Sequence, residues 1–292
     1  MCELLGMSSN VPATLNLSLS KLAEHGGFSG PHRDGWGVAY YEGPDVRLLK
    51  KADAAADSEW NRVVRGHNLR SHIVMAHVRR ATMGERSYRN SQPFARELAG
   101  RMHLFAHNGW LAGIFAAPGF RATRFHPVGE TDSEQAFCVL LDRMSELWMR
   151  PNEVPPLDER LAAVSTFAQE LRRLGPANFL YADADTLFAH GDRRKQAGTS
   201  RADPPGLVRL VLHCPPGKSG FAASGLSVET TDQAIALVAS VPLNDEPWQP
   251  FGEGEVIAIR GGEIAGRRIP ADDQTCVSSQ EIDQFEAKSR LA

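Results

Sequence analysis

The sequence has no long apolar run. In its 292 residues no stretch is apolar for long enough to cross a bilayer, and the start lacks a basic segment followed by an unbroken apolar one. We therefore expect no membrane-spanning helix, no secretory signal peptide and no membrane partner. The expected location is cytoplasmic.

Cysteine is scarce and the net charge is small. The 4 cysteines include no CxxC pair, so neither a disulfide framework nor a zinc site is indicated. The 32 basic and 35 acidic side chains leave a formal charge of −3, which gives no support for a nucleic-acid partner. His72 and His77 are five positions apart and fall on opposite faces of a strand, so we expect no metal site.

The glycine-rich patterns that bind phosphates are incomplete. The stretch CPPGKSG ends like a phosphate-binding loop, but Leu212 stands where such a loop requires glycine. The stretch DGWGVAY lacks the third glycine of a dinucleotide fingerprint. Both patterns therefore argue against a nucleotide-binding site of these two kinds.

What the sequence does contain is an ordinary globular composition, with 42% hydrophobic and 23% charged residues. Apolar patterns predict strands at 36–41, 46–50, 72–78, 101–109, 178–183, 186–190, 207–214, 234–240 and 255–259, and helices at 15–23, 58–69, 131–148 and 157–174. Because strands and helices do not alternate strictly, the pattern predicts a layered α+β fold. We expect one domain over 1–262 and a polar C-terminal tail over 263–292.

The second residue is a candidate nucleophile. Once Met1 is removed, Cys2 carries both a thiol and a free α-amine, whose unperturbed pKa is about 7.7 to 8.0. Such an amine accepts the thiol proton, directly or through water, and leaves a nucleophilic thiolate. Judged from this position alone, a small apolar residue at a strand start is the simpler interpretation. The assignment therefore depends on other residues.

Three other segments offer polar groups that acyl transfer on an amino acid would use. Asn108 and Gly109 end a predicted strand, where they form a hairpin turn, an oxyanion hole, or both. Arg79 is either a solvated arginine or a bidentate clamp for a carboxylate. Asp132 either complements a helix dipole only, or also holds an ammonium group.

Six short motifs follow one another along the chain: MCELLGM, DGWGVAYY, AHVRRAT, NSQPF, AHNG and ETDSE. In this order they resemble the class II glutamine amidotransferases, a family of N-terminal nucleophile hydrolases. The likeness is strongest to small stand-alone members, whose glutaminase domain has no fused synthase. It covers Cys2 to about Glu134, with a weaker likeness in the closing strands. The resemblance implies a four-layer αββα sandwich of two antiparallel sheets.

The resemblance also implies catalytic roles. Cys2 would be the nucleophile with its own amine as the base, and Asn108 and Gly109 would form the oxyanion hole. The thiolate would attack the γ-amide of glutamine or of a γ-glutamyl compound, and water would hydrolyse the resulting thioester. Neither a metal nor an organic cofactor is needed.

Substrate-binding roles follow in the same way. Arg79 would bind the α-carboxylate of glutamine, Asp132 the α-amino group, and Thr82 would line the pocket. The sequence departs from many family members at Arg80, where tryptophan is frequent, and at Gln92, where histidine is frequent; both are expected near the pocket rim.

Three functions stay open on the sequence alone. The chain is an ammonia-producing glutaminase with a synthase partner, a stand-alone hydrolase of γ-glutamyl peptides or amines, or a non-catalytic regulatory subunit on the same scaffold.

Overall fold

Two antiparallel sheets form the centre of the molecule in the computed structural model, which describes residues 2–25, 32–55, 58, 69–196, 199, 201–214 and 232–270. The first sheet has the strand order β13 (Gln249–Pro250), β11 (Val208–Cys214), β12 (Gln233–Ala239), β1 (Glu3–Ala13), β4 (Ser71–Val78), β2 (Trp36–Glu42) and β3 (Asp45–Lys51). The second has the order β15 (Glu263–Arg268), β14 (Glu255–Arg260), β8 (Leu187–Gly191), β7 (Ala177–Ala182), β6 (Arg101–Gly109) and β5 (Phe94–Leu98). A small ribbon joins β9 (Arg194–Lys195) to β10 (Ala202–Asp203).

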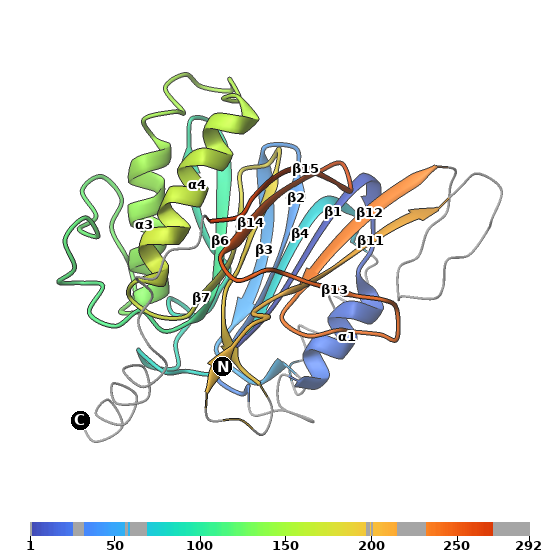
Figure 1. The fold of residues 1–292 in the computed structure, drawn as a ribbon, viewed down its shortest axis with the longest axis horizontal. Helices are drawn as coiled ribbons and strands as arrows, with labels where there is room; N and C mark the ends of the chain where they lie inside the picture. The colour runs from blue at the N-terminus through green and yellow to red at the C-terminus, as the bar shows by residue number, and fades with distance from the viewer. Residues whose placement is uncertain are drawn as a thin grey trace.

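Helices cover the outer face of each sheet. The helix α1 (Asn16–His25) packs Leu19 and Leu22 on the first sheet, while α3 (Asp132–Met144) and α4 (Leu157–Arg172) lie on the second. Figure 1 shows α3 and α4 on one side, α1 on the other and the two sheets between them. The result is a four-layer αββα sandwich, as predicted.

The central strands are buried at successive positions because both of their faces are covered. In β12 all residues from Gln233 to Ala239 are buried, which an alternating, half-solvated strand would not allow. One layer of side chains fills the space between the sheets, including Leu4 and Met75 from the first and Leu104 and Leu180 from the second.

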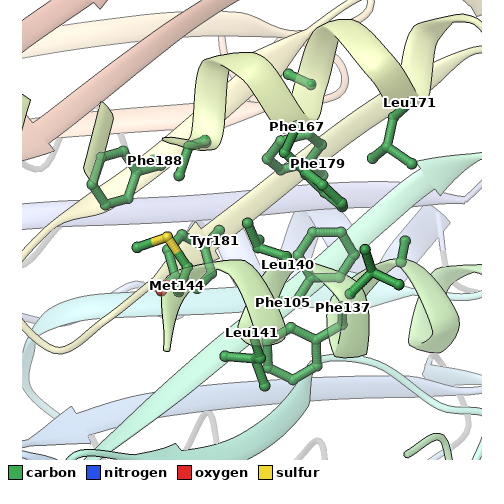
Figure 2. Packing of buried hydrophobic residues seen from close by; sticks show 14 of the residues in the cluster. Phe105, Phe137, Leu140, Leu141, Met144, Phe167, Leu171, Phe179, Tyr181 and Phe188 are labelled. Carbon is green, nitrogen blue, oxygen red and sulfur yellow. The ribbon is translucent and has the colours of Figure 1, made fainter. Parts of the chain in front are cut away.

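A second apolar layer joins the second sheet to α3 and α4. Phe105 from β6 stacks on Phe137 from α3 with ring centres 5.5 Å apart, and Phe167 from α4 meets Phe179 from β7 edge to face. Figure 2 shows these rings between the two helices and the sheet. Burying such large rings provides much of the hydrophobic free energy that holds this layer in place.

The strand directions give the sandwich two distinct ends. At one end, called the Cys2 end, β1 begins, and β4 and β6 finish at Val78 and Gly109. At the opposite end, called the far end, Ser8 of β1 pairs with Ile73 of β4. Residues that are distant in the sequence therefore meet at each end.

Most of the predicted elements are confirmed, with three exceptions. The β6 strand continues through Asn108 and Gly109, which pair with Asn178 and Ala177 of β7, so the predicted hairpin turn at this dipeptide is wrong. The helix α3 ends at Met144, whereas the apolar pattern predicted a helix as far as Trp148; the residues between them form turns. The boundary at 262/263 falls inside the β14–β15 hairpin, so the second sheet extends into the predicted tail.

Two further expectations concern the residues that the structure leaves undescribed. The predicted helix at 58–69 lies mostly outside the described ranges, as does the chain from 271 onward. Within the described residues, no helix is both long and apolar enough to span a membrane.

Candidate active site

Cys2 lies directly before β1, at the edge where β1 meets β4. The side chain is half-buried, and its Sγ accepts a hydrogen bond from the backbone N–H of Arg80 at 3.2 Å. It also lies 3.3 Å from the Arg80 carbonyl oxygen. Pairing of Glu3 with Val78 fixes this contact, because the residues after Val78 must then pass beside Cys2. Arg80 itself points its side chain to solvent.

The surroundings of Cys2 favour the neutral thiol over the thiolate. Burial raises the pKa of the Cys2 thiol, while the Arg80 N–H and the positive charge of Arg79 act in the lowering direction. The negative charge of Asp132 raises the pKa further. A thiol in this state needs a nearby base before it becomes a nucleophile.

Asn108 comes from the end of β6 and faces Cys2 across the two sheets. Its side-chain amide donates to the Cys2 carbonyl at 2.5 Å and to the Ser240 hydroxyl at 3.3 Å. The other amide atom, Oδ1, is buried and has no hydrogen-bond partner in the described part of the chain. The amide predicted for the oxyanion hole is therefore next to the backbone of the predicted nucleophile.

Gly109 occupies a position that has no room for a side chain. An added Cβ would overlap the Pro176 carbonyl oxygen and come within 2.6 Å of His107 Nε2. Here the glycine is required by a close approach between β6 and the residue before β7, and not by a turn.

Asp132 is a buried carboxylate at the first residue of α3. Its Oδ2 accepts from the backbone N–H of Leu111 at 2.8 Å, and its Oδ1 accepts from the backbone N–H of Ser133 at 2.8 Å. Asp132 is only 4% exposed, yet its carboxylate forms no ion pair with any described residue. A buried carboxylate held only by neutral donors attracts a cation, and a ligand ammonium group would supply one.

Arg79 is buried and already engaged. One terminal nitrogen donates to the Glu85 carbonyl at 3.0 Å, and the other donates to the carbonyls of Met83 at 2.8 Å and Gly84 at 3.1 Å. The side chain therefore fixes the loop that follows β4. Thr82 lies in this loop and is exposed, with its side chain unbonded to described residues.

The sequence analysis missed Ser240, which follows β12. Its hydroxyl accepts from the Leu4 backbone N–H at 3.0 Å, and its own N–H donates to the Leu4 carbonyl at 3.0 Å. The guanidinium of Arg194 donates to its carbonyl. Ser240 thus holds the start of β1 beside Asn108. The only sequence signal was a polar residue directly after an apolar strand.

Gln92 was expected near the pocket rim and is instead an internal residue. It is 4% exposed, and its Oε1 accepts from the His107 backbone N–H at 2.6 Å. The His107 ring is also buried, with Nδ1 2.9 Å from Ser133 Oγ, and burial lowers its pKa. Among the described residues, no group of three or more His, Cys, Asp or Glu could hold a metal ion.

Comparison with known proteins identifies the family to which the chain belongs. The model of the class II glutamine amidotransferases matches residues 1–283. The chain belongs to the class II glutamine amidotransferase family. The Escherichia coli (strain K12) protein "Putative glutamine amidotransferase YafJ" is 36% identical over 257 residues, which is 87% of this chain and 96% of that protein.

Solved structures of glutamine amidotransferases share the fold. The crystal structure of the "predicted glutamine amidotransferase from Pseudomonas aeruginosa PA01" superposes with a TM-score of 0.63 and 34% identity, over 91% of this chain and 100% of that one. Glutamine phosphoribosylpyrophosphate amidotransferase from B. subtilis aligns with a TM-score of 0.52 and 17% identity, over 91% of this chain and 48% of that one. The second likeness shows the fold alone.

Proposed function

We propose that the protein is a cysteine amidohydrolase that cleaves the γ-amide of glutamine, or of a γ-glutamyl amide, through a thioester on Cys2. The observation that carries the proposal is the buried carboxylate of Asp132, which only neutral donors bind among the described residues and whose charge acts on the Cys2 thiol. A thiol and a buried carboxylate in one site suit a substrate with an ammonium group at one end and an acyl carbon at the other.

The reaction begins once Met1 has been removed. The Cys2 thiol gives its proton to the α-amine, and the thiolate attacks the γ-carbonyl carbon. The carbonyl oxygen then carries a negative charge, which the Asn108 amide and the Gly109 N–H stabilise. For this the Asn108 amide turns from the Cys2 carbonyl toward the substrate.

The intermediate then collapses in two steps. The ammonium of Cys2 returns its proton to the departing nitrogen as the C–N bond breaks, which leaves ammonia or an amine and a γ-glutamyl thioester. Water adds to the thioester with the amine as base, the C–S bond breaks, and glutamate leaves as the thiol is restored.

The head group of the substrate is held on two sides. Asp132 binds the α-ammonium, and Arg79 attracts the α-carboxylate. Because the Arg79 nitrogens already bind carbonyls of residues 83–85, the carboxylate must replace some of these bonds. Substrate binding is thereby coupled to the position of the loop that contains Thr82.

A glutaminase assay with intact-mass measurement tests the proposal. The purified protein is expected to start at Cys2 and to release glutamate from L-glutamine or from a γ-glutamyl dipeptide, whereas Cys2→Ala releases none. Cys138→Ala is the matched control, because Cys138 is a buried residue of α3 with no role in the proposed reaction, and the variant should leave turnover intact. Retention of Met1, or turnover by Cys2→Ala, would contradict the proposal.

The same assay separates the substrates that the sequence left open. Fastest turnover of L-glutamine, with ammonia release that rises when a synthase partner is added, indicates a partnered amidotransferase. Faster turnover of γ-glutamyl peptides or amines indicates a stand-alone hydrolase.

A further inference from the structure

A cavity of about 470 Å³ opens at the far end of the sandwich, between the two sheets. Its walls come from the end of β1, the β2–β3 turn and the start of β4 in the first sheet, and from Arg101 and the β7–β8 and β14–β15 turns in the second. This size falls within the range of about 300 to 1,000 Å³ that is usual for small-molecule sites. We call it the far pocket.

The far pocket is separate from the candidate active site. Ser8 lines it, whereas Cys2 lies at the other end of the same strand. Six residues of strand span about 20 Å. None of the residues that line the far pocket has a role in the proposed reaction.

One arginine in the far pocket has no polar partner among the described residues. Arg101 is the first residue of β6, and its side chain forms no hydrogen bond or ion pair within the described chain. Its Nε is buried and unsatisfied. A partly buried guanidinium without an acceptor is unusual because its desolvation is uncompensated, and an anionic ligand would supply the missing acceptors.

The other charged groups at the far end pair with one another and do not neutralise Arg101. Asp185 accepts from Arg160 at 2.9 Å and pairs with Arg260 at 3.0 Å. Arg160 also binds Asp183 at 2.7 Å. These two carboxylates are balanced by Arg160 and Arg260, so the charge of Arg101 remains uncompensated.

Further donors face the same space. The Ser8 hydroxyl accepts from the backbone N–H of Gly262 at 3.3 Å, which leaves its own proton available to a ligand. Arg260 is engaged through one terminal nitrogen by Asp185, and its side chain is 58% exposed. The far pocket thus presents one unpaired guanidinium, part of a second and a hydroxyl.

We propose that the far pocket binds a small organic anion through Arg101, with a carboxylate or phosphate group as the recognised part. The planar fork of a guanidinium matches both groups in a bidentate geometry. The volume of the cavity accommodates a metabolite larger than an inorganic ion, with Ser8 and Arg260 as additional donors.

Calorimetric titration and thermal unfolding with three probes test this proposal: inorganic phosphate, citrate and adenosine monophosphate, at constant ionic strength. At least one probe is expected to bind saturably and to raise the melting temperature. Arg101→Gln should weaken that binding at least about tenfold, with little effect on the ligand-free protein, because it breaks no hydrogen bond or ion pair within the described residues. Arg260→Gln should weaken it less.

Two control variants locate the binding. Arg150→Gln removes an arginine whose side chain is 77% exposed and pairs with Glu153, and should leave binding unchanged. Cys2→Ala should also bind normally. The proposal is overturned if none of the three probes binds saturably, if Arg101→Gln binds as tightly as the unaltered protein, or if Arg150→Gln loses as much affinity as Arg101→Gln.

Discussion

At the scale of single residues, some polar groups of the candidate site have hydrogen-bond or charge partners within the protein, and others lack them. Arg79 and Ser240 have their hydrogen bonds within the protein, and they fix the loop after β4 and the start of β1. Asp132 lacks a counter-cation and Asn108 Oδ1 lacks a donor in the described structure. Buried polar groups are normally paired. A ligand therefore gains the most binding free energy by supplying partners to these two side chains.

Asn108→Ala should lower kcat by about two to three orders of magnitude, because it removes one donor to the developing oxyanion. KM should change little, since the amide acts mainly on the transition state. Steady-state glutaminase kinetics give both constants, and circular dichroism checks the fold. A variant with normal kcat would leave Asn108 as a residue that only positions the Cys2 backbone.

Asp132→Asn should raise KM for glutamine by about ten- to a hundredfold, since it removes the charge that faces the substrate ammonium but keeps one acceptor oxygen. Glu146→Gln, an exposed substitution just beyond the same helix, is the matched control and should leave KM unchanged. The same rise in KM with a substrate analogue that lacks the α-amine would contradict this contact.

At the scale of elements, nine strands were predictable from their long apolar runs, whereas β1 and β5 were not predicted. The N-terminus of α3 was predicted in part: Thr131 caps Glu134 N–H at 3.2 Å. Among the described residues, the Glu134 carboxylate does not bond back to the Thr131 N–H, because one oxygen accepts from Arg96 at 2.5 Å and the other from the Gly129 N–H at 2.7 Å. Arg96 lies 38 positions away, so local pattern does not reveal its pairing.

The same limit applies to the site. Cys2 and Asp132 could be proposed from their positions at element starts, and Asn108 from the end of a strand. The role of Ser240 depends on the pairing of β12 with β1 across more than 200 positions. The hydrogen bonds from Arg79 to backbone carbonyls depend on how the loop after β4 folds back toward its guanidinium. The hairpin expected at Asn108 failed because long-range pairing with β7 outweighed a local turn preference.

Arg79→Lys should act on the whole loop at 83–85 and not only on the substrate. A lysine ammonium cannot reach the same set of carbonyls with a planar fork, so the loop should become easier to cleave by protease. KM for glutamine should also rise by about tenfold or more. Limited proteolysis and kinetics on one preparation measure both effects, with exposed Arg80→Lys as the control. An unchanged KM together with a loosened loop would assign Arg79 a structural role alone.

At the scale of the whole molecule, three buried histidines make stability depend on pH. Burial lowers the pKa of His77, His103 and His190 to about 3 each. In the unfolded chain a histidine titrates near 6.5. Between these values the unfolded state binds more protons, so stability is highest above about pH 6.5 and falls as the pH drops.

The expected loss between pH 7.5 and pH 5.5 is about 1.4 kcal/mol for each of these histidines, or about 4 kcal/mol for the three. His107, whose pKa burial also lowers, adds to this loss. Asp183 and Asp192 act in the opposite direction, because burial raises their pKa and their folded forms bind protons more readily than the unfolded chain. Urea unfolding at the two pH values measures the net change. Equal stability at both would contradict neutral, buried histidines.

His190→Phe isolates one of the three contributions. Neither ring nitrogen of His190 has a hydrogen-bond partner among the described residues, and the ring stacks on Phe179 with centres 5.1 Å apart. Phenylalanine keeps this aromatic contact and cannot be protonated, so the loss of stability between the two pH values should shrink by about 1.4 kcal/mol. His126→Gln, at an exposed position, should leave the loss unchanged. If both variants lose stability as the unaltered protein does, His190 is not a source of the acid sensitivity.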